Sequence, residues 1–268
     1  MWMTTPLPLP MRILVKGAST VVAMSEWGRP REEFTFPRAL QAALLEAGRP
    51  AEVRTIGVAS ERTKSTLLHW ESEILAWSPD VVILVYGHYE AIHLFLPWWL
   101  ERHANSLRGR PGPVRAAYRK HLLRPAWMAL AKLQSRLDRR LNSTVRRSRP
   151  RRVAADLERL IQHIQSVNHP LVLLVDLLAP GPRARSWFPG MAERLEVMNQ
   201  AIAAMVARVD DPEVRIFHVV DVADRTVPQG EEPTPDGFHY SPMLHREIGR
   251  ALGEEILAWS AKQPHLQD

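Results

Sequence analysis

The feature that most constrains the fold of this chain is a series of five short runs rich in branched aliphatic residues. A strand that is buried on both faces needs apolar residues at every position, as in a parallel sheet covered by helices on both sides. We therefore predict five parallel strands. They cover residues 12–16, 51–56, 81–86, 171–176 and 214–220.

Helical patterns lie between these runs. Proline at position 37 and glycine at position 48 bracket one helix, because these residues favour the start and the end of a helix. A second helix is expected over residues 66–77. Apolar stripes with a 3.6-residue period predict three more helices. The stripes are Val153, Leu157, Leu160, Ile161 and Ile164; Leu195, Met198, Ile202, Met205, Val206 and Val209; and Leu244, Ile248, Leu252 and Ile256.

The alternation of strands and helices predicts an α/β fold of three layers, with a central five-stranded parallel sheet of the flavodoxin-like kind. Residues 95–152 interrupt this alternation, and we interpret them as a helical, arginine-rich insertion after the third strand. A single domain is expected over residues 11–262, insertion included. Residues 1–10 are expected to form a disordered leader.

The positive charge of the chain is concentrated in this insertion. The net charge is +6, yet sixteen lysines and arginines and only one acidic residue, Asp138, lie between Arg102 and Arg152. A basic segment of this kind suggests an anionic or carrier-bound substrate. Nucleic acid is disfavoured as the main partner, because the chain has no binding motif in which aromatic and basic residues alternate.

Several classes of protein are excluded by composition. The chain contains no cysteine, which rules out disulfides, thiolate catalysis and cysteine-ligated zinc. The apolar run at 81–86 is too short to cross a bilayer, and no signal-peptide pattern is present, so we expect a cytoplasmic protein without a membrane span. The spacing of His88, Glu90 and His93 differs from that of a zinc-binding helix, and neither metal nor cofactor is expected.

Polar residues follow the strands where their carboxyl ends are expected, which is the edge at which parallel sheets bind ligands. Ser19 follows the first strand, and Asp236 and His239 precede the last helix. A serine hydroxyl needs a base such as histidine, and an aspartate can orient that base. The residues therefore suggest acyl transfer, although Ser19 could also be a helix cap, Asp236 a turn residue and His239 a buried structural histidine.

The order of these blocks resembles the SGNH/GDSL hydrolases. The resemblance implies an esterase without a cofactor, with Ser19 as nucleophile, His239 as base and Asp236 as its orienting partner. The family's oxyanion hole uses the serine amide, a glycine amide and an asparagine side chain. The glycine aligns with Ser60, and the asparagine aligns with Tyr89.

The blocks also depart from the family's pattern. Gly-Asp-Ser reads Gly17-Ala18-Ser19 here, and the third block reads Gly87-His88-Tyr89-Glu90. We expect this third block to line the oxyanion and substrate site. Two further functions stay open: a catalytically silent binding module, favoured by the missing asparagine, and an acyltransferase that uses an acceptor other than water.

Overall fold

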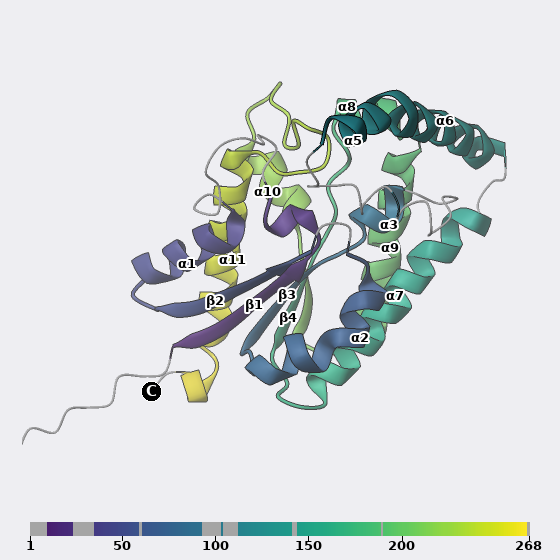
Figure 1. Cartoon of the computed structure of the whole chain (residues 1–268). Coiled ribbons are helices and arrows are strands. Elements are labelled where there is room, and N and C mark those ends of the chain that lie inside the picture. The colour runs from purple at the N-terminus through teal and green to yellow at the C-terminus, as the bar shows by residue number, and fades with distance from the viewer. Residues whose placement is uncertain are drawn as a thin grey trace, which may run out of the picture.

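The computed structural model describes residues 10–23, 35–58, 61–92, 103, 112–140, 144–188 and 190–266. Ser60, His93 and residues 1–9 of the expected leader lie outside these ranges. The described residues form a central parallel sheet with helices on both faces (Figure 1), which confirms the predicted fold class. The strands are β1 (Met11–Gly17), β2 (Ala51–Gly57), β3 (Val81–Val85), β4 (Leu171–Val175) and β5 (Val214–Phe217).

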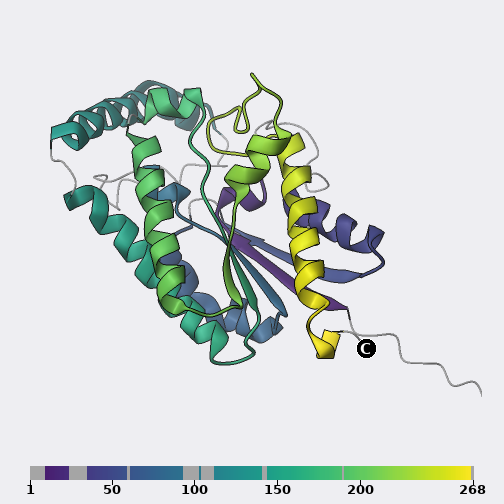
Figure 2. The same ribbon diagram turned by 180° about the vertical axis from the view of Figure 1, so that it is seen from behind.

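The strand order is β2-β1-β3-β4-β5, which is the flavodoxin-like order. Every residue of β3 and β4 is buried, as their continuous apolar sequences predict. Two helical layers provide this burial (Figures 1 and 2). One layer contains α1 (Phe36–Glu46), α10 (Val219–Thr226) and α11 (Pro242–Ser260); the other contains α2 (Thr63–Glu73), α7 (Thr144–Gln165) and α9 (Met191–Val209).

The fifth strand is shorter than predicted, because a helix starts inside the apolar run. Val219 and Val220 donate their backbone amides to Asp176 Oδ1, at 2.7 and 3.3 Å. A carboxylate in this position satisfies amides that the first turn of a helix leaves without partners. The run therefore ends as a strand at Phe217 and continues as α10.

The described part of the insertion is helical. Residues 113–140, which we call the cationic arm, form one continuous helix made of α5 (Pro113–Tyr118), a π-helical turn η4 (Arg119–Leu123) and α6 (Arg124–Arg140). The arm lies above α9, on the side of the molecule where the strands end (Figure 1), and packs on α8 (Pro182–Trp187). The end of the insertion and the predicted helix after it are one helix, α7, with Pro150 inside it.

Candidate active site

Ser19 lies just beyond the carboxyl end of β1. It is the first residue of a short 3-10 helix, η1 (Ser19–Val21), and its side chain is half-buried. The first residue of a helix has an amide that no carbonyl within the helix satisfies. Ser19 therefore combines a hydroxyl and an unsatisfied backbone donor at the edge of the sheet where ligands bind.

Asp236 and His239 lie on a tight turn before α11. One carboxylate oxygen, Asp236 Oδ1, accepts the amides of Phe238 and His239 at 2.9 and 2.8 Å. The other, Oδ2, lies 2.6 Å from His239 Nδ1. Gly237 has φ +93°, and a Cβ there would lie 2.5 Å from the Ala184 Cβ, so the turn requires glycine.

The structure joins this turn to Ser19. His239 Nε2 lies 3.0 Å from Ser19 Oγ, although the two residues are 220 positions apart in the chain. The side chains of His239 and Asp236 are only 12% and 18% exposed. The serine, the imidazole and the carboxylate thus form one hydrogen-bonded series, in the arrangement that activates a serine for nucleophilic attack.

The electrostatics of the turn favour an ionised Asp236. Burial alone would raise the pKa of this carboxyl, but the hydrogen bonds from the His239 side chain and from the amides of His239 and Phe238 outweigh burial. The pKa of Asp236 is therefore held below its ordinary value. A carboxylate that is ionised near neutral pH can stabilise a positive charge on the adjacent imidazole.

His88 begins α3 (His88–Ile92), next to the same site. Burial and the charge of His239 lower the pKa of His88 to about 4, so that its imidazole is neutral near neutral pH. The ring is 7% exposed, and among the described residues its Nδ1 has no hydrogen-bond partner.

The other residues of the third block occupy different surroundings. Glu90 is buried and its Oε1 accepts the Thr63 amide at 2.9 Å, which fixes the start of α2 against α3. Burial raises the pKa of Glu90. Tyr89 is half-buried, and the Arg62 guanidinium lies 5.6 Å from its ring centroid. Gly87 has φ +118°, and a Cβ there would lie 2.6 Å from Leu177 Cδ1.

A family model, that of the GDSL-like lipase/acylhydrolase family, matches residues 17–246. The chain belongs to this family. GDSL-like hydrolases of this class cleave ester bonds with a serine nucleophile, and the match confirms the predicted family and reaction class. No curated protein matches the chain by sequence.

Solved structures with the same fold cover most of this hydrolase at low sequence identity. A lipase/acylhydrolase from Enterococcus faecalis has a TM-score of 0.59 at 14% identity, over 93% of this chain and 96% of its own. A catalytic mutant of Axe2, an acetylxylan esterase from Geobacillus stearothermophilus, has a TM-score of 0.57 at 12% identity, over 93% and 95%. An alpha/beta hydrolase from the metagenome of Lake Arreo, Spain, has a TM-score of 0.57 at 13% identity, over 92% and 94%.

A buried ion cluster behind the site of this hydrolase did not emerge from the sequence analysis. Lys16, which is fully buried in β1, lies 2.9 Å from Glu61 Oε1 and 2.8 Å from Glu73 Oε2. Tyr86 donates its hydroxyl to Glu61 Oε2 at 3.3 Å. The cluster ties the end of β1 to the loop after β2. A lysine inside an otherwise apolar run was the available signal, because a buried cation needs anionic partners.

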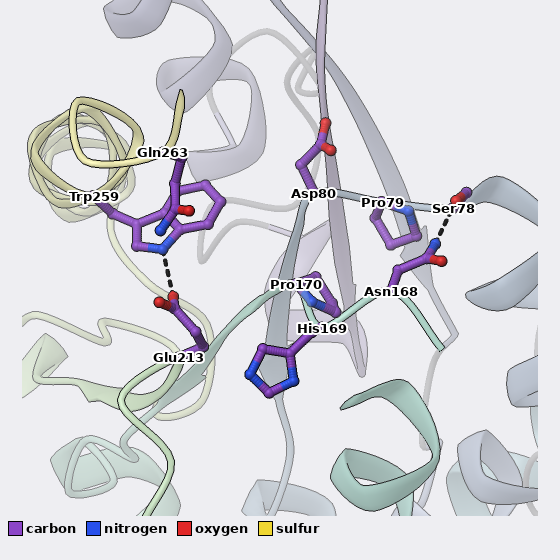
Figure 3. Close-up of a pocket in the computed structure, with 9 residues that line it drawn as sticks. All are labelled: Ser78, Pro79, Asp80, Asn168, His169, Pro170, Glu213, Trp259 and Gln263. Carbon is purple, nitrogen blue, oxygen red and sulfur yellow. Dashed lines mark hydrogen bonds between the residues drawn. The ribbon is translucent and has the colours of Figure 1, made fainter. Parts of the chain in front are cut away.

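A cavity of about 320 Å³ lies at the opposite, amino-terminal edge of the sheet (Figure 3). Its polar groups are engaged in the fold: Asp80 accepts the Arg12 amide at 2.8 Å, Glu213 accepts the Trp259 indole N–H, and Ser78 accepts the Asn168 amide. We therefore assign the chemistry to the carboxyl edge. Within the described ranges, no group of three or more acidic or histidine side chains could hold a metal ion.

Proposed function

We propose that this GDSL-like hydrolase cleaves small carboxylic esters with a triad formed by Ser19, His239 and Asp236. The observation that carries the proposal is the series of two contacts through one imidazole, Ser19 Oγ to His239 Nε2 at 3.0 Å and His239 Nδ1 to Asp236 Oδ2 at 2.6 Å. A neutral histidine whose Nδ1 bears the proton presents a basic Nε2 to the serine hydroxyl.

In the proposed reaction, Ser19 Oγ attacks the ester carbonyl carbon as His239 Nε2 takes the hydroxyl proton. The tetrahedral intermediate then collapses, the alcohol leaves with the proton from His239, and an acyl-serine ester remains. Water then attacks the acyl-serine by the same steps, which releases the carboxylic acid and restores Ser19. Asp236 keeps its negative charge throughout and stabilises the imidazolium.

The developing oxyanion needs donors that are in place before the reaction. We propose the amides of Ser19 and Ser60 for this role, together with the Gly87–Tyr89 loop. Glu90 acts as a positioning residue here, since its bond to the Thr63 amide holds the start of α2 against α3. His88, neutral and buried beside His239, is proposed to contact the substrate.

The Tyr89 hydroxyl is the proposed replacement for the family's asparagine amide. Loss of one oxyanion donor typically lowers turnover about 100- to 1,000-fold. Tyr89→Phe is therefore expected to lower kcat by at least about 100-fold with little change in KM, measured by steady-state hydrolysis. The substitution retains the ring that faces Arg62, and unchanged turnover would remove the phenol from the mechanism.

A fluorescent fluorophosphonate tests the proposed function directly, because it labels only an activated serine. We expect the wild type and the control Ser72→Ala, which changes an exposed serine on α2, to be labelled equally. Ser19→Ala should lose the label. A folded wild type that takes up no label would favour the silent binding module instead.

The substrate is proposed to carry an anionic group, either its own or that of a carrier. The support is the Arg62 guanidinium beside the third block and the basic arm above the same edge of the sheet. A screen that pairs neutral esters with carboxylate- or phosphate-bearing esters of equal acyl length tests this preference. Equal kcat/KM values within each pair would contradict it.

A further inference from the structure

The cationic arm, residues 113–140, carries apolar side chains that the fold does not cover. Among the residues from 112 to 137 whose burial is described, none is buried. Val114, Leu122 and Leu133 are 80%, 64% and 51% exposed. Leu122 and Leu133 are eleven residues, about three helical turns, apart, so both extend from nearly the same side of the helix.

The remainder of the arm is strongly basic. Six exposed cations lie between residues 112 and 137, and no acidic residue occurs there. They are Arg115, Arg119, Lys120, Arg124, Lys132 and Arg136. Half-buried Trp127 and Leu130 precede Leu133 by six and three residues, so Trp127 lies about 120° around the helix from Leu133. Arg119 and Arg136 each lie three residues from an exposed leucine, Leu122 or Leu133, so cations flank the exposed leucines on the same side. A helix whose exposed surface combines Lys, Arg and Leu, and whose overall hydrophobicity is low, has the composition of segments that lie in a membrane interface.

Contacts place the arm beside the catalytic turn. The arm packs on α8, and in α8 the Ala184 Cβ would lie 2.5 Å from a Cβ at Gly237, inside the turn from Asp236 to His239. Phe188, which follows α8, packs edge-to-face against Phe238 with ring centroids 5.9 Å apart. A surface that holds the arm would therefore lie at the carboxyl edge of the sheet, near Ser19.

We propose that the cationic arm binds the surface of an anionic lipid bilayer, with Val114, Leu122 and Leu133 in the interface and the basic residues against lipid phosphates. Long basic side chains can keep their charges among the headgroups while their stems follow the helix into the apolar boundary. Apart from Asp138, the arm contains no acidic residue, and its positive charge is complementary to an extended anionic surface. No helix that the structure describes is long and apolar enough to span a bilayer, so the attachment is peripheral.

The test is co-sedimentation with vesicles, and it does not depend on the proposed esterase activity. Vesicles of phosphatidylcholine with about one-third phosphatidylglycerol are compared with pure phosphatidylcholine vesicles. We expect at least tenfold stronger partitioning to the anionic vesicles. Raising NaCl from about 0.1 M to about 1 M should weaken it severalfold, because the Debye length falls from about 10 Å to about 3 Å.

Matched double variants separate the arm from a general effect of added acids. Leu122→Glu/Leu133→Glu removes two arm leucines, whereas Leu45→Glu/Leu68→Glu removes leucines of 64% and 70% exposure on α1 and α2 and changes the net charge equally. The arm variant should bind anionic vesicles at least tenfold more weakly, and the control should bind like the wild type. Thermal melting and hydrolysis of a soluble ester verify folding of both variants.

Three results would overturn the proposal. The first is a folded wild type that does not sediment with anionic vesicles. The second is an equal loss of binding in the arm and control variants. The third is binding of the arm to an acidic carrier protein with no binding to vesicles, which would make the partner a protein.

Discussion

Among the residues that the structure describes, the carboxyl edge of the sheet carries two histidine–aspartate pairs, and one of them is connected to a serine. His239 and Asp236 are 2.6 Å apart and 12% and 18% exposed, and Ser19 completes the series. His218 and Asp176 are 3.1 Å apart, and His218 is 59% exposed. The same two residue types thus occur at the same edge, in different surroundings.

The difference lies in what else each carboxylate holds. Asp236 accepts amides of its own turn, and this fixes the imidazole that it orients. Asp176 accepts the amides that begin α10, and burial raises the pKa of Asp176 despite the opposing bond from His218. A histidine–aspartate contact by itself therefore does not identify a catalytic pair. Burial and a third group on the far ring nitrogen distinguish the pair that we propose to be catalytic.

The largest expected effect separates the two imidazoles. His239→Ala should lower kcat by about 10⁴-fold or more, as loss of the base does in serine enzymes. The matched variant His218→Ala should leave kcat within about twofold. Steady-state hydrolysis of one ester by both purified variants makes the measurement, and similar losses in both would contradict the assignment of His239.

The next effect separates the two carboxylates. Asp236→Asn should lower kcat about 10³- to 10⁴-fold, because an amide no longer favours the productive tautomer of His239. Asp176→Asn, measured in the same assay, should retain wild-type kcat. An active Asp236→Asn enzyme would show that the turn needs only its hydrogen bonds and not the negative charge.

The buried His245 should make the stability of the fold depend on pH. Burial lowers the pKa of His245 to about 4; its Nδ1 accepts the Phe36 amide at 3.1 Å. An unfolded histidine titrates near 6.5, so between about pH 6.5 and 4 the unfolded chain binds a proton that the native chain rejects. Stability from the neutral ring is present above about pH 6.5 and is lost as the pH falls.

This loss of stability at low pH can be measured by urea unfolding. The free energy of unfolding of His245→Gln, relative to wild type, should rise by on the order of 2 kcal/mol between pH 7.5 and pH 4.5. A constant difference between His245→Gln and wild type across this range would exclude His245 as a source of acid sensitivity.

The smallest effect concerns Asp176 as a helix cap. Asp176→Ala removes the acceptor of the two amides that begin α10 and should lower the free energy of unfolding by about 1–2 kcal/mol. Turnover of the folded fraction should not change. Thermal melting together with kcat measures both quantities, and an unchanged melting temperature would argue against the capping role.

Local pattern was sufficient to predict the sheet but not every boundary. The five runs predict five strands to within a few residues. The expected burial on both faces is complete in β3 and β4, whereas β2 at the edge of the sheet exposes Glu52, Arg54 and Thr55. The prediction for residues 214–220 was wrong at its end, because an apolar residue such as Val219 is compatible with both a strand and a helix. Only the distant Asp176 carboxylate determines that α10 begins there.

The candidate site likewise has parts that the sequence predicts and parts that it does not. Ser19, Asp236 and His239 follow from strand ends and a motif, and the structure brings them within hydrogen-bonding distance. The partners of Lys16 are 45 and 57 positions away, and no local pattern reports such a pairing. Glu90 was predicted to line the site, while its bond to Thr63 emerges only in three dimensions.

The distance in sequence between Ser19 and His239 affects how the protein is made. A ribosome delivers Ser19 220 residues before His239. His245 in α11 then accepts the Phe36 amide of α1, which joins two segments that are 209 residues apart. A nascent chain that has not yet reached His239 lacks the base that we propose for Ser19, and its serine is expected to behave as an ordinary alcohol.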